Sequence, residues 1–421
     1  TAQMSRETVL GICTVAGGAT AHTAILARAL DIPAVAGLGE ALFAAVAEGD
    51  RLAVDGASGE VFVRPEAGVA QDFTIRASVR RAQRESARAA AQGVASHIGQ
   101  TRDGTPIAVL ANVGSVAEAR SAGEWGAEGI GLLRTEFLFA ERTTLPDEHE
   151  QAALYTAIVA ALGRPGATVV VRTLDAGNDK PLPALAPYTR ELPSEANPAL
   201  GIRGFRLYDA FPALLETQLR GIVRAAATTG AELHVMLPMI ATVEELLRAR
   251  MVLRDVEAAL ASQDVRVARP LKLGIMIETP AAVLNAAALA READFFSLGT
   301  NDLAQYVMAS DRLNPRLIEL TDARQPAVLR AIAQAAAAGR EAGRTVAVCG
   351  EMAGDPQLAG LLVGLGVNEL SMSPASIVAV KQALAERAYT EYTALAARAL
   401  AASTREEVVA ALRGAPSDAA T

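Results

Sequence analysis

From residue 107 onwards, short apolar runs alternate with long segments of helical pattern. The apolar runs are hydrophobic at nearly every position, which is typical of parallel strands buried on both faces. The segments between them are rich in Ala, Leu, Glu and Arg, residues that favour helices. We predict eight strands, over residues 107–113, 129–133, 168–174, 232–238, 272–278, 295–300, 345–350 and 368–372.

Eight strands alternating with helices predict a closed barrel. They extend over about 265 residues, close to the ~250 typical of a (β/α)8 barrel. A doubly wound open sheet would need fewer strands and a glycine-rich first turn, and ANVGSV (111–116) is a poor dinucleotide-binding motif. The fold class is therefore predicted to be α/β, with a TIM barrel. One or two helices over 375–401 would close it, and the Pro-rich segment 181–198 would form a loop over an active site.

The first 65 residues follow a different pattern. Short apolar runs at 8–16, 32–38, 51–59 and 60–65 alternate with glycine turns around one helical run at 22–30. This predicts a small α/β unit.

A long helical segment follows this unit. Helix formers predominate between residues 66 and 103, and several arginines give the segment a basic face: Arg76, Arg80, Arg81, Arg84 and Arg88. We interpret it as a linker helix with a solvated face, in preference to a nucleic-acid-binding helix. The predicted domains are thus 1–65, the linker 66–103, and the barrel 104–421.

Composition narrows the class of protein. With 421 residues, of which 51% are hydrophobic, the chain can bury one or more sizeable cores. Its net charge of −8 argues against a general nucleic-acid binder. Two cysteines form neither a disulfide framework nor a zinc motif, which favours the cytoplasm. No apolar run approaches the ~18 residues of a membrane span. A chain that opens on Thr1 without a signal peptide is expected to be a fragment.

Reactive side chains gather where the predicted strands end. In a (β/α)8 barrel the loops after the carboxyl ends of the strands share one face. A single charge there is often a helix cap or a rim ion pair, but a whole set of buried charges without a ligand would cost several kcal/mol each. The strand-end residues are Arg134, Glu136, Arg172, Asp175, Asp179, Lys180, Glu278, Asn301, Asp302, Cys349 and Glu351.

This set of residues is suited to one kind of chemistry. Paired arginines match a phosphate or a carboxylate. The oxygen ligands of Glu278 and Asp302 suit Mg²⁺, which takes one or two protein carboxylates and completes its shell with substrate and water. Cys349 is mostly a thiol at neutral pH and can donate a proton. Such a site can stabilise an enolate and then protonate it.

A second candidate site lies at GGATAHTAILARALDIPAVAG (17–37). Here His22 follows a Gly-Gly turn and small residues, at the start of a predicted helix. Small neighbours leave the imidazole accessible, and a helix N-terminus offers N–H groups to an attached anion. These features fit a histidine that accepts a phosphoryl group. The other histidines, His97, His149 and His234, have no such setting, and we interpret them as structural.

The combination of motifs resembles a known family, Enzyme I of the bacterial phosphoenolpyruvate-dependent sugar phosphotransferase system. The segment 17–37 looks like its phosphohistidine signature. The later motifs follow in the family's order and cover essentially the whole chain: GAEGIGLLRTEFLF, VVRTLDAGNDKPLP, NPALGIRGFR, MLPMI, GIMIETPAA, DFFSLGTNDLAQYVMASDRLN, VCGEMAGDP and NELSMSPASI.

The resemblance implies a role for each matching residue. His22 would be phosphorylated, and Cys349 would donate the proton that turns the enolate into pyruvate. Glu278 and Asp302 would hold Mg²⁺. The substrate phosphoenolpyruvate would be bound by Arg134, Arg172, Arg203, Asn301, Asp302 and Arg312. Strand-end reasoning does not find Arg203 and Arg312, because they lie in loops.

The resemblance also implies an architecture and partners. Residues 1–65 would be the later part of a small swivelling phosphohistidine domain. A histidine phosphocarrier protein would accept the phosphoryl group, although the helical subdomain that docks it in the family is missing here. The barrel would form a homodimer, with no nucleic acid bound and no membrane insertion.

The sequence departs from the family signature beside His22. Ala19 stands where a basic residue is usual, and Ala21 stands where Ser is usual, so hydrogen bonding around the histidine is expected to be weaker. Two alternatives stay open. One is a fragment of a phosphoenolpyruvate synthase or pyruvate phosphate dikinase, which share the barrel but tend to have Ala where this chain has Thr23. The other is a non-catalytic module that binds phosphoenolpyruvate and dimerises.

Overall fold

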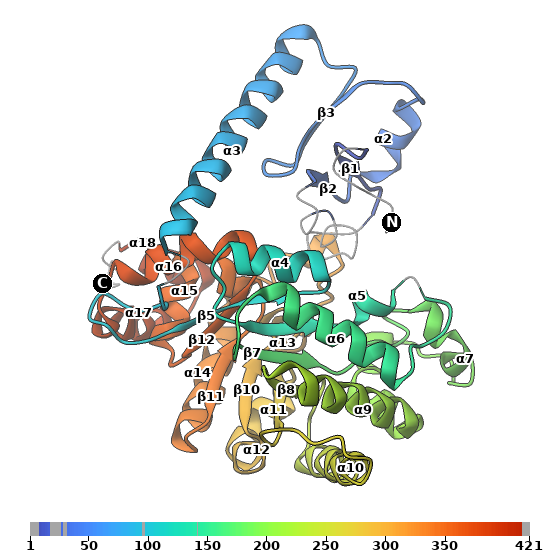
Figure 1. Ribbon diagram of the computed structural model, residues 1–421. Helices are drawn as coiled ribbons and strands as arrows, with labels where there is room; N and C mark the ends of the chain where they lie inside the picture. Colours follow the sequence, from blue (N-terminus) through green and yellow to red (C-terminus); the bar gives the residue numbers. More distant parts are fainter. Residues whose placement is uncertain (1–7, 17–26, 28–31, 95–96, 141, 415–421) are drawn as a thin grey trace. The chain divides into compact units, whose positions relative to one another are not determined.

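The computed structural model describes residues 8–16, 27, 32–94, 97–140 and 142–414 (Figure 1). The chain divides into two compact units. One comprises Thr1–Ala90 together with Ser310–Asp322, and the other comprises Ala91–Ala309 together with Ala323–Thr421.

The larger unit is built on a closed parallel barrel of eight strands, which confirms the predicted TIM barrel. Helices surround these strands (Figure 1). Each strand pairs with the next along the chain, and the last pairs with the first, in the order β5 to β12. The strands are β5 (Ala108–Val113), β6 (Ile130–Arg134), β7 (Thr168–Arg172), β8 (Glu232–Leu237), β9 (Lys272–Ile277), β10 (Phe295–Leu298), β11 (Thr345–Val348) and β12 (Glu369–Met372).

The helices of this unit follow the strands in the expected alternation. They are α4 (Val116–Glu124), α5 (Thr135–Phe139), α6 (Glu148–Leu162), α7 (Ala186–Thr189), α8 (Phe205–Ala210), α9 (Pro212–Thr229), α10 (Val243–Ala261), α11 (Pro280–Leu284), α12 (Ala286–Glu292), α13 (Thr300–Val307), α14 (Pro326–Glu341), α15 (Pro356–Gly364), α16 (Ile377–Ala385), α17 (Tyr389–Ala401) and α18 (Arg405–Arg413). The sequence analysis predicted α16 and α17 but not α18.

The segment predicted as an active-site loop is partly helical. Short 3-10 turns form at η1 (Pro183–Leu185) and η2 (Pro198–Leu200), and α7 follows η1 directly. Proline stands in the first turn of each of these elements, where its fixed φ and missing N–H are tolerated. Similar turns occur at η4 (Glu351–Gly354) and η5 (Pro374–Ser376).

The smaller unit contains two short sheets. Strands β1 (Ile12–Cys13) and β2 (Ala34–Val35) pair in parallel, and β3 (Leu52–Asp55) pairs antiparallel with β4 (Glu60–Val63). Helix α2 (Gly39–Ala45) was not predicted, and the turn η3 (Pro315–Leu317) also belongs to this unit. The helix expected over residues 22–30 lies outside the described residues except for Ala27.

A single long helix, α3 (Ala67–Val94), follows the second sheet, as predicted for the linker. Within the smaller unit its arginines pair with acidic residues of the β3–β4 hairpin. Arg80 hydrogen-bonds to the buried Asp55, and Arg76 Nη1 lies 2.8 Å from Glu60 Oε2. The hydrogen bond from Arg80 holds the pKa of Asp55 well below its ordinary value. Arg76 and Arg80 of the basic face therefore form ion pairs within the chain.

The buried ammonium group of Lys381, at the amino ends of the strands, is fully paired. Lys381 of α16 donates to the carbonyls of His97 and Gly126 at 2.8 and 2.9 Å, and its Nζ lies 3.1 Å from Glu128 Oε1. The carboxylate of Glu128 also accepts from the amide of Gly99 at 2.8 Å. This cluster fixes the segment around residues 97–99 to the barrel.

Among the described residues, no helix combines the length and hydropathy that a bilayer span requires.

Candidate active site

The carboxyl ends of the barrel strands carry a cluster of charges centred on Asp175, which lies just after β7 and is fully buried. Its carboxylate lies 2.8 Å from Arg203 Nη2, 2.9 Å from Lys180 Nζ and 3.4 Å from Arg172 Nη1. Burial opposes ionisation, but the three cations outweigh it and hold the pKa of Asp175 well below its ordinary value. A carboxylate that favours its ionised form therefore organises the cations at this end of the barrel, which we call the mouth.

Arg203 is the largest of the fully buried side chains, although it lies in the loop after η2. Its Nη2 lies 3.1 Å from Asp302 Oδ2, and its Nη1 lies 3.0 Å from Asp179 Oδ2. Burial disfavours the charged guanidinium, but Asp175, Asp302 and Asp179 raise its pKa. The backbone of Arg203 passes so close to Gly177 that a Cβ there would lie 2.6 Å from Arg203 Cβ.

Arg134 and Arg172 end two neighbouring strands of the barrel. They are register partners at the ends of β6 and β7, so their backbones are adjacent. Arg172 Nη2 lies 3.1 Å from Glu136 Oε2, and its Nη1 lies 3.8 Å from Met276 Sδ. The Nε of Arg172 is buried and has no hydrogen-bond partner among the described residues. This unpaired donor points to an anionic ligand.

Glu278 and Asp302 bring two more carboxylates to the mouth. Glu278 follows β9 and is fully buried, and Asp302 lies in the first turn of α13. Glu278 Oε1 accepts from the amide of Met239 at 2.7 Å, whereas its Oε2 has no hydrogen-bond partner in the described part of the chain. Burial, with the charges of Asp302 and Asp175, raises the pKa of Glu278 to about 8.

The orphan oxygen of Glu278 provides a test of the predicted magnesium site. A Cβ on Gly299 would lie 2.9 Å from this oxygen, so a glycine leaves the space beside it clear. The described residues contain no group of three or more His, Cys, Asp and Glu side chains suited to a metal. Mg²⁺ needs only one or two protein carboxylates, however, so an unpaired carboxylate oxygen beside a second carboxylate fits this ion.

Cys349 lies one residue after β11, and its side chain is 3% exposed. Burial raises the pKa of the thiol, even though Arg172 and Arg134 act in the opposite direction. Its Sγ lies 3.7 Å from the carbonyl oxygen of Leu298. The cysteine is therefore held as a protonated thiol inside the barrel.

Of the remaining predicted residues, one lies at the mouth, one belongs to the smaller unit, and one lies outside the described residues. The side chain of Asn301, at the start of α13, accepts from the amide of Glu351 at 3.2 Å, so it lies next to the Cys349 segment. Arg312 belongs to the segment Ser310–Asp322 and is described with the smaller unit. His22 lies outside the described residues.

Two residues of the mouth were not predicted from the strand ends, because they lie within helices α13 and α9. The hydroxyl of Tyr306 donates to the carbonyl of Ala199 and accepts from Arg203 Nη1 at 3.2 Å. Tyr306 follows Asp302 by one helical turn on α13, so i,i+4 spacing is a signal that could have identified it.

Gln218 lies behind the ends of β6 and β7. It accepts from the amide of Leu174 at 2.9 Å and donates to Thr135 Oγ1 at 3.2 Å. Gln218 could have been identified from the sequence as a polar residue within the apolar stripe of α9, which includes Leu215 and Leu219.

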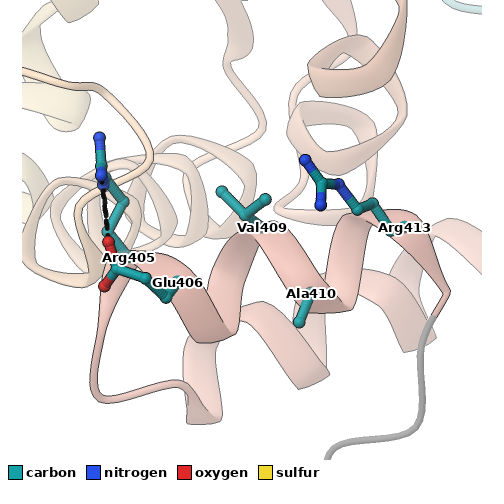
Figure 2. A pocket seen from close by; sticks show the side chains of 5 residues that line it. All are labelled: Arg405, Glu406, Val409, Ala410 and Arg413. Carbon is teal, nitrogen blue, oxygen red and sulfur yellow. Dashed lines mark hydrogen bonds and ion pairs between the residues drawn. The ribbon is translucent and has the colours of Figure 1, made fainter.

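A surface pocket elsewhere on the larger unit is unrelated to this cluster. It is lined by Arg405, Glu406, Val409, Ala410 and Arg413, all from α18 (Figure 2). None of these residues follows a barrel strand.

Sequence comparisons identify relatives of the whole chain. Residues 88–389 match the PEP-binding domain of PEP-utilising enzymes, and residues 1–59 match the mobile domain of the same enzymes. A phosphoenolpyruvate-protein phosphotransferase of Haloferax volcanii is 48% identical over 412 residues, which cover 97% of this chain and 69% of the relative. One from Bacillus sp. (strain S) is 41% identical over 97% of this chain and 68% of its own length.

A longer relative is the multiphosphoryl transfer protein of Rhodobacter capsulatus. It is 45% identical over 97% of this chain, and the chain spans 47% of its length. Since the PEP-binding domain covers most of the chain and these relatives match nearly all of it, the chain belongs to the PEP-utilising enzymes and, among them, to the phosphoenolpyruvate-protein phosphotransferase family.

Proposed function

We propose that this chain transfers the phosphoryl group of phosphoenolpyruvate to its own His22 and releases pyruvate. The proposal rests on two of the buried polar atoms in the mouth that lack a hydrogen-bond partner in the described part of the chain. Arg172 Nε is a buried donor, and Glu278 Oε2 is a buried acceptor, and neither has a partner among the described residues. A site with an unmet need for both an anion and a cation fits a phosphorylated carboxylic acid accompanied by Mg²⁺.

In this proposal the arginines bind and orient the substrate. Arg134 and Arg172, side by side on β6 and β7, bind the phosphate. Arg203, Asn301, Asp302 and Arg312 contribute further contacts, with Arg203 fixed by Asp175. Glu278 and Asp302 would hold Mg²⁺, which when bound supplies positive charge to the phosphate and enolate oxygens.

Phosphoryl transfer then depends mainly on positioning and charge neutralisation. A ring nitrogen of His22 attacks the phosphorus and forms a P–N bond. The P–O bond to the enol oxygen breaks, and its electron pair stays on that oxygen as enolate. The guanidinium groups of Arg134 and Arg172 stabilise the transferring group in a largely buried site.

Cys349 completes the reaction by protonating carbon. Its raised pKa keeps the proton on sulfur until the enolate forms. The S–H bond breaks, the electron pair of the enolate forms a C–H bond at C3, and pyruvate leaves. The resulting thiolate recovers a proton from solvent.

The proposed division of the chain follows from this reaction. Residues 1–65 would carry His22 between sites, the linker 66–103 would connect them, and 104–421 would bind phosphoenolpyruvate. The phosphoryl group would pass to a histidine phosphocarrier protein, and the barrel would form a homodimer. The match to named phosphotransferases favours this function over a phosphoenolpyruvate synthase or pyruvate phosphate dikinase.

Labelling with [³²P]phosphoenolpyruvate tests the proposal. His22→Ala should abolish labelling of the chain, because no other histidine is proposed to accept the phosphoryl group. Cys349→Ala should still be labelled but should form pyruvate much more slowly. The exposed His149 is the matched control, and His149→Ala should behave as the parent does.

Three outcomes would contradict the proposal. Equal loss in both assays for His22→Ala and Cys349→Ala would remove their separate roles. Labelling of His22→Ala would move the acceptor elsewhere. A parent chain that binds phosphoenolpyruvate but takes up no label would support a non-catalytic binding module instead.

A further inference from the structure

The backbone of Cys349 is held by side chains from other parts of the barrel. β11 ends at Val348, and the amide of Cys349 donates to the carbonyl of Leu298 at 3.1 Å. Its own carbonyl accepts a hydrogen bond from Asn112 Nδ2 at 2.9 Å. Asn112 lies on β5, so the peptide after the cysteine is oriented from a distant strand.

Asn112 is itself fixed by a buried hydroxyl. Ser371 Oγ donates to Asn112 Oδ1 at 2.6 Å, and Ser371, on β12, is fully buried. The carbonyl of Cys349 can only accept, so it assigns the orientation of the amide, and the hydroxyl of Ser371 then donates to Asn112 Oδ1. A flipped Asn112 would place its Oδ1 against the carbonyl oxygen of Cys349, where two acceptors would face each other.

A glycine on a third strand makes room for the hydroxyl. A Cβ on Gly131 of β6 would lie 2.6 Å from Ser371 Oγ and 2.7 Å from Ser371 Cβ. Any larger residue there would displace Ser371 or the strand. Three strands thus combine to present one amide N–H to the carbonyl of Cys349.

The peptide is also confined on its other side. A Cβ on Gly350 would lie 2.9 Å from the amide nitrogen of Thr300, so the backbone packs closely against the start of α13. The next amide, of Glu351, donates to Asn301 Oδ1 at 3.2 Å. The peptide between Cys349 and Gly350 is therefore constrained by Asn112 on one side and by α13 on the other.

We infer that Asn112 is a positioning residue for Cys349, and that Ser371 holds Asn112 in the orientation this requires. The inference rests on the proposed function, in which Cys349 donates the proton. Rotation of the 349–350 peptide would move the Cα–Cβ bond of the cysteine and hence its sulfur. A displacement on the order of 1 Å can reduce a proton-transfer rate by roughly tenfold to a hundredfold. Phosphoryl transfer uses groups on other strands and should be affected little.

The test compares two partial reactions of the same chain. The first is labelling by [³²P]phosphoenolpyruvate in the presence of Mg²⁺. The second is deuterium uptake from D₂O into the methyl group of added pyruvate, followed by ¹H NMR, which uses the thiol to exchange a proton at C3. Asn112→Asp keeps the shape and the acceptor for Ser371 but replaces the donor to Cys349 with a negatively charged acceptor, which repels the carbonyl oxygen.

We expect Asn112→Asp to slow methyl exchange by roughly tenfold or more and to change labelling by less than about threefold. Ser371→Ala, which removes only the hydroxyl, should give the same pattern at smaller size. The exposed Asn285 is the matched control, and Asn285→Asp should keep both rates at the parent values. A simple loss of folded protein would lower both rates together, so it cannot produce this split.

The possible failures are distinguishable. If the parent chain takes no label, the proposed function is wrong. If the parent is active and Asn112→Asp loses both rates equally, or keeps its exchange rate, the positioning role is wrong. Should Asn112→Asp not fold, Ser371→Ala decides, and an unchanged ratio of the two rates in that variant overturns the inference.

Discussion

Two clusters of buried charge, one at each end of the barrel, differ in how completely their polar atoms are paired. At the amino ends of the strands, Lys381 has two carbonyl acceptors and the carboxylate of Glu128. At the mouth, Glu278 Oε2 and Arg172 Nε have no hydrogen-bond partner among the described residues. The first arrangement is complete without any ligand, whereas the second leaves polar atoms that a ligand can satisfy.

The cluster around Lys381 is expected to contribute to stability, and the cluster around Glu278 is expected to contribute to function. A satisfied buried ion pair holds loops in place and has nothing left to offer a substrate. An unsatisfied buried carboxylate costs stability in the free protein, and it persists because it gains a partner during the reaction. The two ends should therefore respond in opposite ways to substitution.

The largest effect is expected at the mouth. Glu278→Gln should lower the labelling rate by roughly a thousandfold, because the proposed metal site loses a charged ligand. The same change should raise the midpoint of thermal unfolding in metal-free buffer, since it removes a buried carboxylate next to Asp302 and Asp175. Labelling kinetics and calorimetry of the metal-free protein measure the two effects.

The exposed Glu216 provides the control for this substitution. Glu216→Gln should change neither quantity appreciably. A Glu278→Gln variant that unfolds more easily than the parent without metal would show that this carboxylate stabilises the free protein, and the comparison between the two ends would fail.

At the amino end, a substitution is expected to lower stability and leave the labelling rate unchanged, the reverse of Glu278→Gln. Lys381→Met should lower the free energy of unfolding by about 3 kcal/mol, because two carbonyls and Glu128 lose their buried partner. The labelling rate per folded molecule should stay near the parent value. Urea unfolding gives the first quantity. The exposed Lys272 is the control, and Lys272→Met should change stability by less than about 0.5 kcal/mol.

A smaller effect should follow from pH at the same end. Burial, helped by Lys272, lowers the pKa of His234 to about 4, below its ordinary 6.5. The unfolded chain therefore binds more protons between these values, and stability falls as the pH is lowered from 6.5 towards 4. We expect His234→Gln to remove about 1–2 kcal/mol of this decline, measured by urea unfolding at several pH values. His149→Gln, at an exposed position, should retain the parent's slope; an equal change in both variants would exclude His234 as the source.

Strand-end position predicted much of the mouth, for a physical reason. All strands of a parallel barrel point the same way, so residues directly after them must share one face. Arg172, Asp175, Glu278 and Asp302 were found in this way, and the structure brings them together.

Residues that reach the mouth from elsewhere were harder to find. Arg203 comes from a loop and was supplied only by the family resemblance. Tyr306, Gln218 and Asn112 were missed. Each acts through a contact between elements far apart in the chain, and a linear pattern does not contain such contacts.

The sequence by itself determined the barrel and the charged character of its mouth, because strand burial and strand direction leave a local mark in every apolar run and at every strand end. Only the tertiary structure decided which charges are paired. Asp175 binds three cations while Glu278 keeps an unpaired oxygen, although both are acidic residues beside a strand end. The difference arises from neighbours on other strands and loops, whose distances depend on how the barrel closes.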